Sequence, residues 1–168
     1  MLRHLSKDGF TLIELIIVVA IIGLLAAAAF VAVDPAKRIG KANDATRWSD
    51  VTAIADAIMK YTVDNNGSLP SGVSSASADT EYMIHIEGGT ASGTDVCTST
   101  GNTDSELDIS SGLVSEYIAT MPLDPNVAAS AAELTGIGYY FEKDANGRIK
   151  VGACIESAYA AASIYVQR

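Results

Sequence analysis

Gly9-Phe10-Thr11-Leu12-Ile13-Glu14-Leu15 opens an apolar stretch that continues to Val33. The 24 residues from Phe10 to Val33 contain a single ionisable side chain, the carboxylate of Glu14. A helix of this length extends about 36 Å at 1.5 Å per residue, which exceeds the roughly 30 Å thickness of a bilayer's hydrocarbon core. The stretch therefore predicts a membrane-spanning helix with one carboxylate inside it.

Glu14 is expected to have a function, because a charged side chain such as Asp at the bilayer centre costs about 2.5 to 3.5 kcal/mol on insertion scales. No Lys, Arg or His lies between Phe10 and Val33 to neutralise it. A cut between Gly9 and Phe10 would create an α-amino group about one helical turn from the carboxylate, and a neighbouring copy of the helix would offer the same amine. We expect Glu14 to pair with such an amine.

Residues Gly9 to Glu14 resemble the processing and assembly motif of type IV prepilins and of the pseudopilins of type II secretion. In that family a prepilin peptidase cuts after the glycine, and the new N-terminal residue is usually N-methylated. The glutamate pairs with the N-terminal amine of an adjacent subunit. The resemblance implies cleavage between Gly9 and Phe10, methylation of Phe10 and an assembly role for Glu14. It also implies an α+β pilin fold, with a long N-terminal helix packed on a small antiparallel sheet.

Two alternative interpretations of the apolar stretch explain less of it. A Sec signal peptide would be cut at a small-residue site such as Ala26-Ala27-Ala28-Ala29, but its apolar core normally has about 7 to 15 residues. A simple single-span anchor fits the length. Both alternatives leave the charge of Glu14 unexplained.

The chain is expected to have four parts: a leader (1–9), a membrane and assembly helix (10–33), its amphipathic continuation (34–66) and a globular head (67–168). Arg3 and Lys7 of the leader indicate a cytoplasmic N-terminus by the positive-inside rule. Lys37, Arg38 and Lys41 follow the span and oppose this trend. We expect them either to pair with acidic groups of neighbouring subunits or to remain solvated at the headgroup level.

Local patterns predict the elements of the chain. We expect one long kinked helix from about Thr11 to Asn65, in which Asp34-Pro35 either caps a second helix or kinks a single one. Further predictions are a loop over 68–78, a strand over 82–86, a serine-capped helix over 110–121, a turn over 122–125, a hairpin of 138–142 with 149–155, and a final strand or packed segment over 159–166.

The negative charge of the chain argues against one class of partner, nucleic acid. The formal net charge is -9, and the chain without its first nine residues keeps 9 basic and 19 acidic side chains. Such a surface repels phosphates, so we expect no direct binding of nucleic acid.

Cys97 and Cys154 lie outside any C-x-x-C pair, and an oxidising compartment predicts a disulfide between them. Two buried free thiols are the alternative.

The sequence lacks the usual catalytic motifs. It has no Gly-x-Ser-x-Gly, no phosphate-binding loop and no zinc-binding His-Glu pair, and only His85 remains after the leader is removed. We therefore expect no enzymatic activity, no catalytic residue, no metal and no cofactor.

The resemblance implies a structural subunit of a type IV pilus. The precursor would be a single-pass protein of the cytoplasmic membrane, and the mature subunit would lie in an extracellular fibre. Its partners would be its own copies, a prepilin peptidase and an inner-membrane assembly platform. The alternatives are a pseudopilin of a type II secretion or competence system, and a minor adhesive tip pilin.

Overall fold

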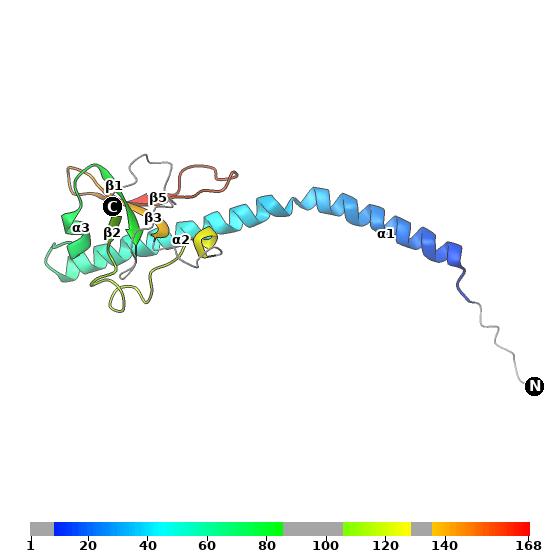
Figure 1. Ribbon diagram of the computed structural model, residues 1–168, viewed down its shortest axis with the longest axis horizontal. Coiled ribbons are helices and arrows are strands. Elements are labelled where there is room, and N and C mark those ends of the chain that lie inside the picture. The colour runs from blue at the N-terminus through cyan, green and yellow to red at the C-terminus, as the bar shows by residue number, and fades with distance from the viewer. Residues whose placement is uncertain (1–8, 86–105, 129–135) are drawn as a thin grey trace, which may run out of the picture. The chain divides into compact units, whose positions relative to one another are not determined.

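The computed structural model describes residues 9–85, 106–128 and 136–168, and the chain divides into two compact units, Met1–Ile39 and Gly40–Arg168 (Figure 1). Two helices, α1 (Leu12–Val33) and α2 (Pro35–Asp64), come first, and α2 crosses the boundary between the units. The remaining elements are α3 (Ser71–Ser75), β1 (Thr80–His85), β2 (Glu106–Asp108), α4 (Pro125–Ala128), β3 (Gly136–Lys143), β4 (Ile149–Ala153) and β5 (Tyr165–Gln167). This is the predicted α+β class.

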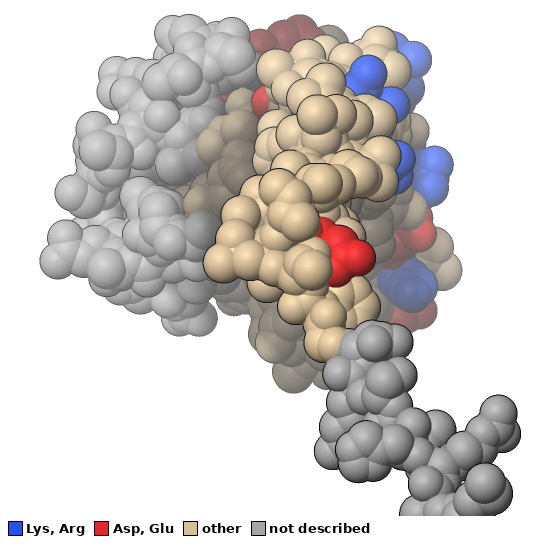
Figure 2. Space-filling view, turned by 90° about the vertical axis from the view of Figure 1, so that its right-hand side faces the viewer, with Lys and Arg blue, Asp and Glu red and all other residues tan. Residues whose placement is uncertain are grey.

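Helix α1 leaves its whole apolar surface uncovered. None of its 22 residues is buried, and the stretch is long and apolar enough to cross a membrane. The surface nearest the viewer in Figure 2, which looks at the structure from its N-terminal end, accordingly carries few charged side chains. Contiguous apolar surface of this extent marks a membrane or protein interaction site, so α1 requires lipid or other apolar helices around it.

Asp34 separates the two helices. Its backbone has a left-handed φ of 43°, which ends α1, and its carboxylate accepts a hydrogen bond from the Lys37 amide at 3.3 Å. Pro35 is the first residue of α2, where its missing N–H removes no helical hydrogen bond. The Arg38 side chain donates to the Val33 carbonyl at 3.0 Å, at the end of α1. The long kinked helix predicted from about Thr11 to Asn65 is therefore confirmed over Leu12–Asp64, and Asp34 caps its second part, α2.

The core of the second unit forms where α2 packs on a five-stranded sheet. The strands lie in the order β2-β1-β3-β4-β5, and all neighbours are antiparallel except β1 and β2. Each aliphatic side chain buried here contributes about 1.5 to 3 kcal/mol. The helix contributes Val51, Ile54, Ala55, Ala57 and Ile58, and the sheet contributes Ile84, Ile137, Tyr139, Phe141, Ile149 and Val151.

The predicted hairpin is confirmed. Strands β3 and β4 pair from Tyr139 with Ala153 to Lys143 with Ile149. The turn between them is held by the Asp144 carboxylate, which accepts hydrogen bonds from the amides of Asn146 and Arg148, while Gly147 adopts a φ of 83°. Such a φ favours glycine, which explains why this turn could be read from the sequence.

Three local predictions are wrong or incomplete. Residues 110–121 form turns rather than a helix, because Gly112 and Ser115 have φ of 84° and 74° and interrupt helical hydrogen bonding. The predicted loop over 68–78 contains the short helix α3, and β2 was not predicted. The expected strands near 82–86 and at the end of the chain are present as β1 and β5.

Candidate functional site

The Gly9–Phe10 peptide bond lies outside regular structure. Helix α1 begins at Leu12, two residues beyond Phe10. Both Gly9 and Phe10 are exposed, and Phe10 keeps 92% of its surface accessible. An exposed bond in irregular backbone can enter the active site of a peptidase without any helical turn being unwound.

Thr11 caps α1 and fixes the position of Glu14. The Thr11 amide donates to Glu14 Oε2 at 2.9 Å, and the Thr11 hydroxyl donates to the same oxygen at 2.6 Å. The Glu14 amide in turn donates to Thr11 Oγ1 at 3.3 Å. This is a capping box, and such caps contribute about 0.5 to 2 kcal/mol to a helix. The role of Thr11 was not predicted, although the Thr-x-x-Glu pattern would have indicated it.

The Glu14 carboxylate is consequently positioned for a second partner. Both bonds from Thr11 reach Oε2, and Oε1 accepts no hydrogen bond from the described residues. Thr11 directly follows Phe10, so the carboxylate lies next to the residue that cleavage would make N-terminal. The structure thus brings the predicted cleavage, methylation and assembly residues together at one helix start. A free Oε1 suits a charge-assisted hydrogen bond from an ammonium group.

A second polar cluster, which was not predicted, lies inside the second unit, Gly40–Arg168. Arg47 is fully buried and binds the buried Asp124 through two hydrogen bonds, Nε to Oδ2 at 2.6 Å and Nη2 to Oδ1 at 3.1 Å. Its Nη1 donates to Asp44 at 2.8 Å, and Asp44 also accepts hydrogen bonds from the amide and the hydroxyl of Ser157. The cluster therefore ties α2 to two loops that are distant in sequence. Arg47 and Asp124 are 77 positions apart in the sequence, which leaves no local signal for the pair.

Asp50 lies about one turn beyond Arg47 on α2, in surroundings that disfavour its charged form. Tyr139, which is fully buried, donates to Asp50 Oδ2 at 2.5 Å. Burial raises the pKa of Asp50, the hydrogen bond from Tyr139 lowers it, and the negative charge of Asp124 raises it again, so the net direction is upward. For Asp44, burial also raises the pKa, but the hydrogen bonds from Ser157 and Arg47 lower it by more. Neighbouring carboxylates on one helix thus respond oppositely to the fold.

The lowered pKa of Asp44 predicts a loss of stability in acid. A carboxylate with a lowered folded-state pKa adds stability that is present above its unfolded pKa of about 3.9 and is lost as the pH falls through the folded value. Asp44→Asn should flatten this part of the profile. We expect the urea midpoint of the detergent-solubilised chain to fall less between pH 6 and pH 3 in the variant. Equal slopes in the two proteins would contradict the assigned role, since Asp50 is present in both.

Two other predictions, on a disulfide and on metal binding, concern residues outside the two clusters described above. Cys154 is buried directly after β4, but Cys97 lies outside the described residues, so their disulfide stays a prediction. Within residues 9–85, 106–128 and 136–168, no group of three His, Cys, Asp or Glu side chains is arranged to hold a metal ion.

Comparison with known protein families identifies the N-terminal motif. Residues 5–30 match the family described as the prokaryotic N-terminal methylation motif, a range that includes Gly9, Phe10 and Glu14. No curated protein matches the chain, and no solved structure does. The similarity thus covers residues 5–9 of the predicted leader and most of α1, and the resemblance seen in the sequence is confirmed there.

Proposed function

Since residues 5–30 carry the class III signal peptide of type IV pilins and pseudopilins, we propose that this chain is the structural subunit of a type IV pilus. The motif implies processing by a prepilin peptidase and assembly into pilus-type filaments. It also makes the chain a precursor of the pilin or pseudopilin kind. The proposal concerns the finer identity, a fibre-forming subunit that reaches the cell surface.

The observation that carries the proposal is the arrangement at the start of α1. The exposed Gly9–Phe10 bond, the carboxylate held beside it and the uncovered apolar helix form a consecutive series within 25 residues. A membrane anchor requires only the helix. Glu14 Oε1, which accepts no hydrogen bond from the described residues, would have a partner when a neighbouring subunit supplies an N-terminal amine.

Assembly then follows from the physical chemistry of α1. The precursor helix lies in lipid, which is as apolar as its own side chains, so packing between helices and polar contacts decide association. Transfer into a bundle of identical helices keeps the apolar surface covered. The pair between Glu14 and a neighbouring Phe10 amine fixes the register of the helices. Such a buried pair acts mainly through specificity, because desolvation offsets most of its attraction.

Intact-mass and N-terminal peptide analysis of material sheared from the cell surface tests this function. We expect an abundant fibre protein that begins at N-methylated Phe10. A chain that starts after Ala26–Ala29, or one that retains Met1 and stays in the membrane, would contradict it. A processed chain confined to short fibres of the cell envelope would instead identify a pseudopilin, and a processed chain at low copy number at the fibre tip a minor pilin.

A further inference from the structure

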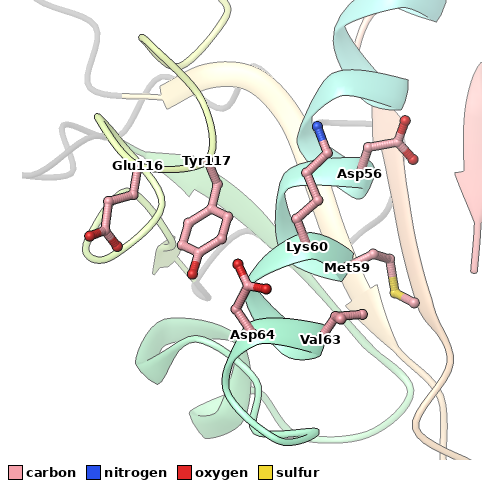
Figure 3. A pocket seen from close by; sticks show the side chains of 7 residues that line it. All are labelled: Asp56, Met59, Lys60, Val63, Asp64, Glu116 and Tyr117. Atoms are coloured by element: carbon pink, nitrogen blue, oxygen red, sulfur yellow. The ribbon is translucent and has the colours of Figure 1, made fainter.

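A groove lies on the second unit between the last turns of α2 and the turn at residues 116–117 (Figure 3). It encloses about 520 Å³ and belongs entirely to the second unit. Its lining residues are Asp56, Met59, Lys60, Val63, Asp64, Glu116 and Tyr117.

The groove has an acidic side and an apolar side. Figure 3 shows Glu116, Tyr117 and Asp64 grouped together, with Met59 and Val63 on the other side of the helix end. Val63 leaves 75% of its surface accessible and Met59 38%. Desolvation raises the pKa of the Tyr117 hydroxyl, and the negative charge of Asp64 raises it further, in line with a negative potential on the acidic side.

The charges of the groove are mostly available to a ligand. It contains three carboxylates and one ammonium group, that of Lys60. Asp56 also meets Arg168 at 3.3 Å, but both side chains are nearly half exposed, and such surface pairs contribute little. Asp64 and Glu116 form no ion pair with any described residue. The groove therefore favours a cation with an apolar stem.

The first turns of α2 carry cations of this kind. Lys37 and Lys41 are exposed, and neither forms an ion pair within the described part of the chain. Their spacing of four residues places them on one face of the helix. Lysine covers apolar surface with its methylene stem while its ammonium group remains polar. The stem would pack on Met59 and Val63, and the ammonium group would reach the carboxylates.

The two surfaces cannot meet within one molecule. Lys41 and Asp56 lie fifteen residues apart on the same helix, which corresponds to about 22 Å along its axis, whereas a salt bridge requires about 4 Å. We propose that the groove binds the Lys37–Lys41 segment of a second copy of this chain, displaced along α2. The offset between Lys41 and the two acids of α2, Asp56 and Asp64, sets this displacement at about 22 to 35 Å.

This inference rests on the proposed function, since the contact is heterologous and repeats along a polymer. A head-to-tail contact of this kind produces an open helical fibre unless the rotation closes a ring. The groove of each subunit binds the Lys37–Lys41 segment of one neighbour. The Lys37–Lys41 segment of the same subunit remains available to the groove of another neighbour. The contact would supplement the one proposed at Glu14.

Charge reversal with rescue tests the contact in the full chain. K37E/K41E and D56K/D64K should each lower fibre yield by about tenfold or more, because like charges then face each other. The four changes combined should restore the yield. The control R148E alters an exposed head arginine away from the groove and should leave the yield unchanged. Failure of the combined variant to restore fibres would overturn the proposal, and a loss confined to K37E/K41E with poor processing would assign the lysines to lipid headgroups instead.

A measurement independent of fibres separates this inference from the proposed function. Full-length chains with and without nitrogen-15 are mixed in detergent and treated with a carbodiimide, which joins an ammonium group to a nearby carboxylate with loss of water. We expect mixed-isotope peptides that join Lys37 or Lys41 to Asp56, Asp64 or Glu116. Their absence, in preparations that form other intermolecular links, would overturn the contact even if fibres assemble.

Discussion

Glu14→Gln is expected to abolish fibre formation while the precursor is still inserted into the membrane. Gln keeps the hydrogen bonds of a capping box, so the start of α1 should be preserved. What is lost is the negative charge that, in the proposed assembly, neutralises the Phe10 amine of a neighbouring subunit. Leaving one member of a buried ion pair uncompensated costs about 3 to 5 kcal/mol, which corresponds to a loss in fibre yield of about a hundredfold or more. Yield is measured on sheared surface fractions, with total precursor as the reference.

Thr11→Ala is the matched control for Glu14→Gln. It removes the hydroxyl that bonds to Glu14 Oε2 but keeps the carboxylate. The loss of an N-cap costs about 1 kcal/mol, so fibres should form at a moderately reduced level. Wild-type yield from the Gln variant would show that the charge is not required. Equal losses in both variants would assign the effect to the helix cap.

Arg47→Met should destabilise the head more than any single change to a surface ion pair. Arg47 and Asp124 are both fully buried and joined by two hydrogen bonds, and Asp44 shares the same guanidinium group. Met fills part of the volume but leaves Asp124 buried without its countercharge. We expect the free energy of unfolding to fall by about 3 to 5 kcal/mol.

Arg148→Met provides the comparison for Arg47→Met. Arg148 also pairs with an aspartate at 2.6 Å, but its side chain is 62% exposed, and such pairs contribute about 0 to 1 kcal/mol. Urea unfolding of the detergent-solubilised full chain can be followed through Trp48, the only tryptophan and the neighbour of Arg47. Similar losses in the two variants would contradict a structural role for the buried cluster. If the Met variant does not fold, Arg47→Lys should retain one hydrogen bond and give an intermediate stability.

Local patterns identified the residues at the start of α1 because the relevant chemistry is local. Gly9, Phe10 and Glu14 lie within six positions, and the apolar run after them has no competing charge. The capping box that orients Glu14 is also a short-range pattern, so the capping role of Thr11 could also be predicted from the sequence. In contrast, only the structure shows that both bonds from Thr11 reach Oε2 and that Oε1 accepts none from the residues the structure describes.

Within the head, the spacing of apolar residues predicted secondary structure less reliably than it did at the N-terminus. Residues 110–121 have a helical pattern of apolar side chains, and Leu113 is indeed buried, yet two left-handed residues divide the segment into turns. Gly112 adopts such a conformation readily, whereas Ser115 does so only because the surrounding structure imposes it. The groove next to this segment depends on those turns, which place Glu116 and Tyr117 beside α2.

The sequence by itself determined the long apolar helix, the match to the methylation motif, the break at Asp34-Pro35 and the hairpin around Gly147, because each depends on neighbours within a few residues. The proposed cleavage and assembly residues lie within the same local motif. Only the tertiary structure decided which charges are buried. Arg47 meets Asp124 across 77 residues and Asp44 meets Ser157 across 113. The attraction within such pairs becomes large only where the fold removes water, and that removal is a property of the packed chain.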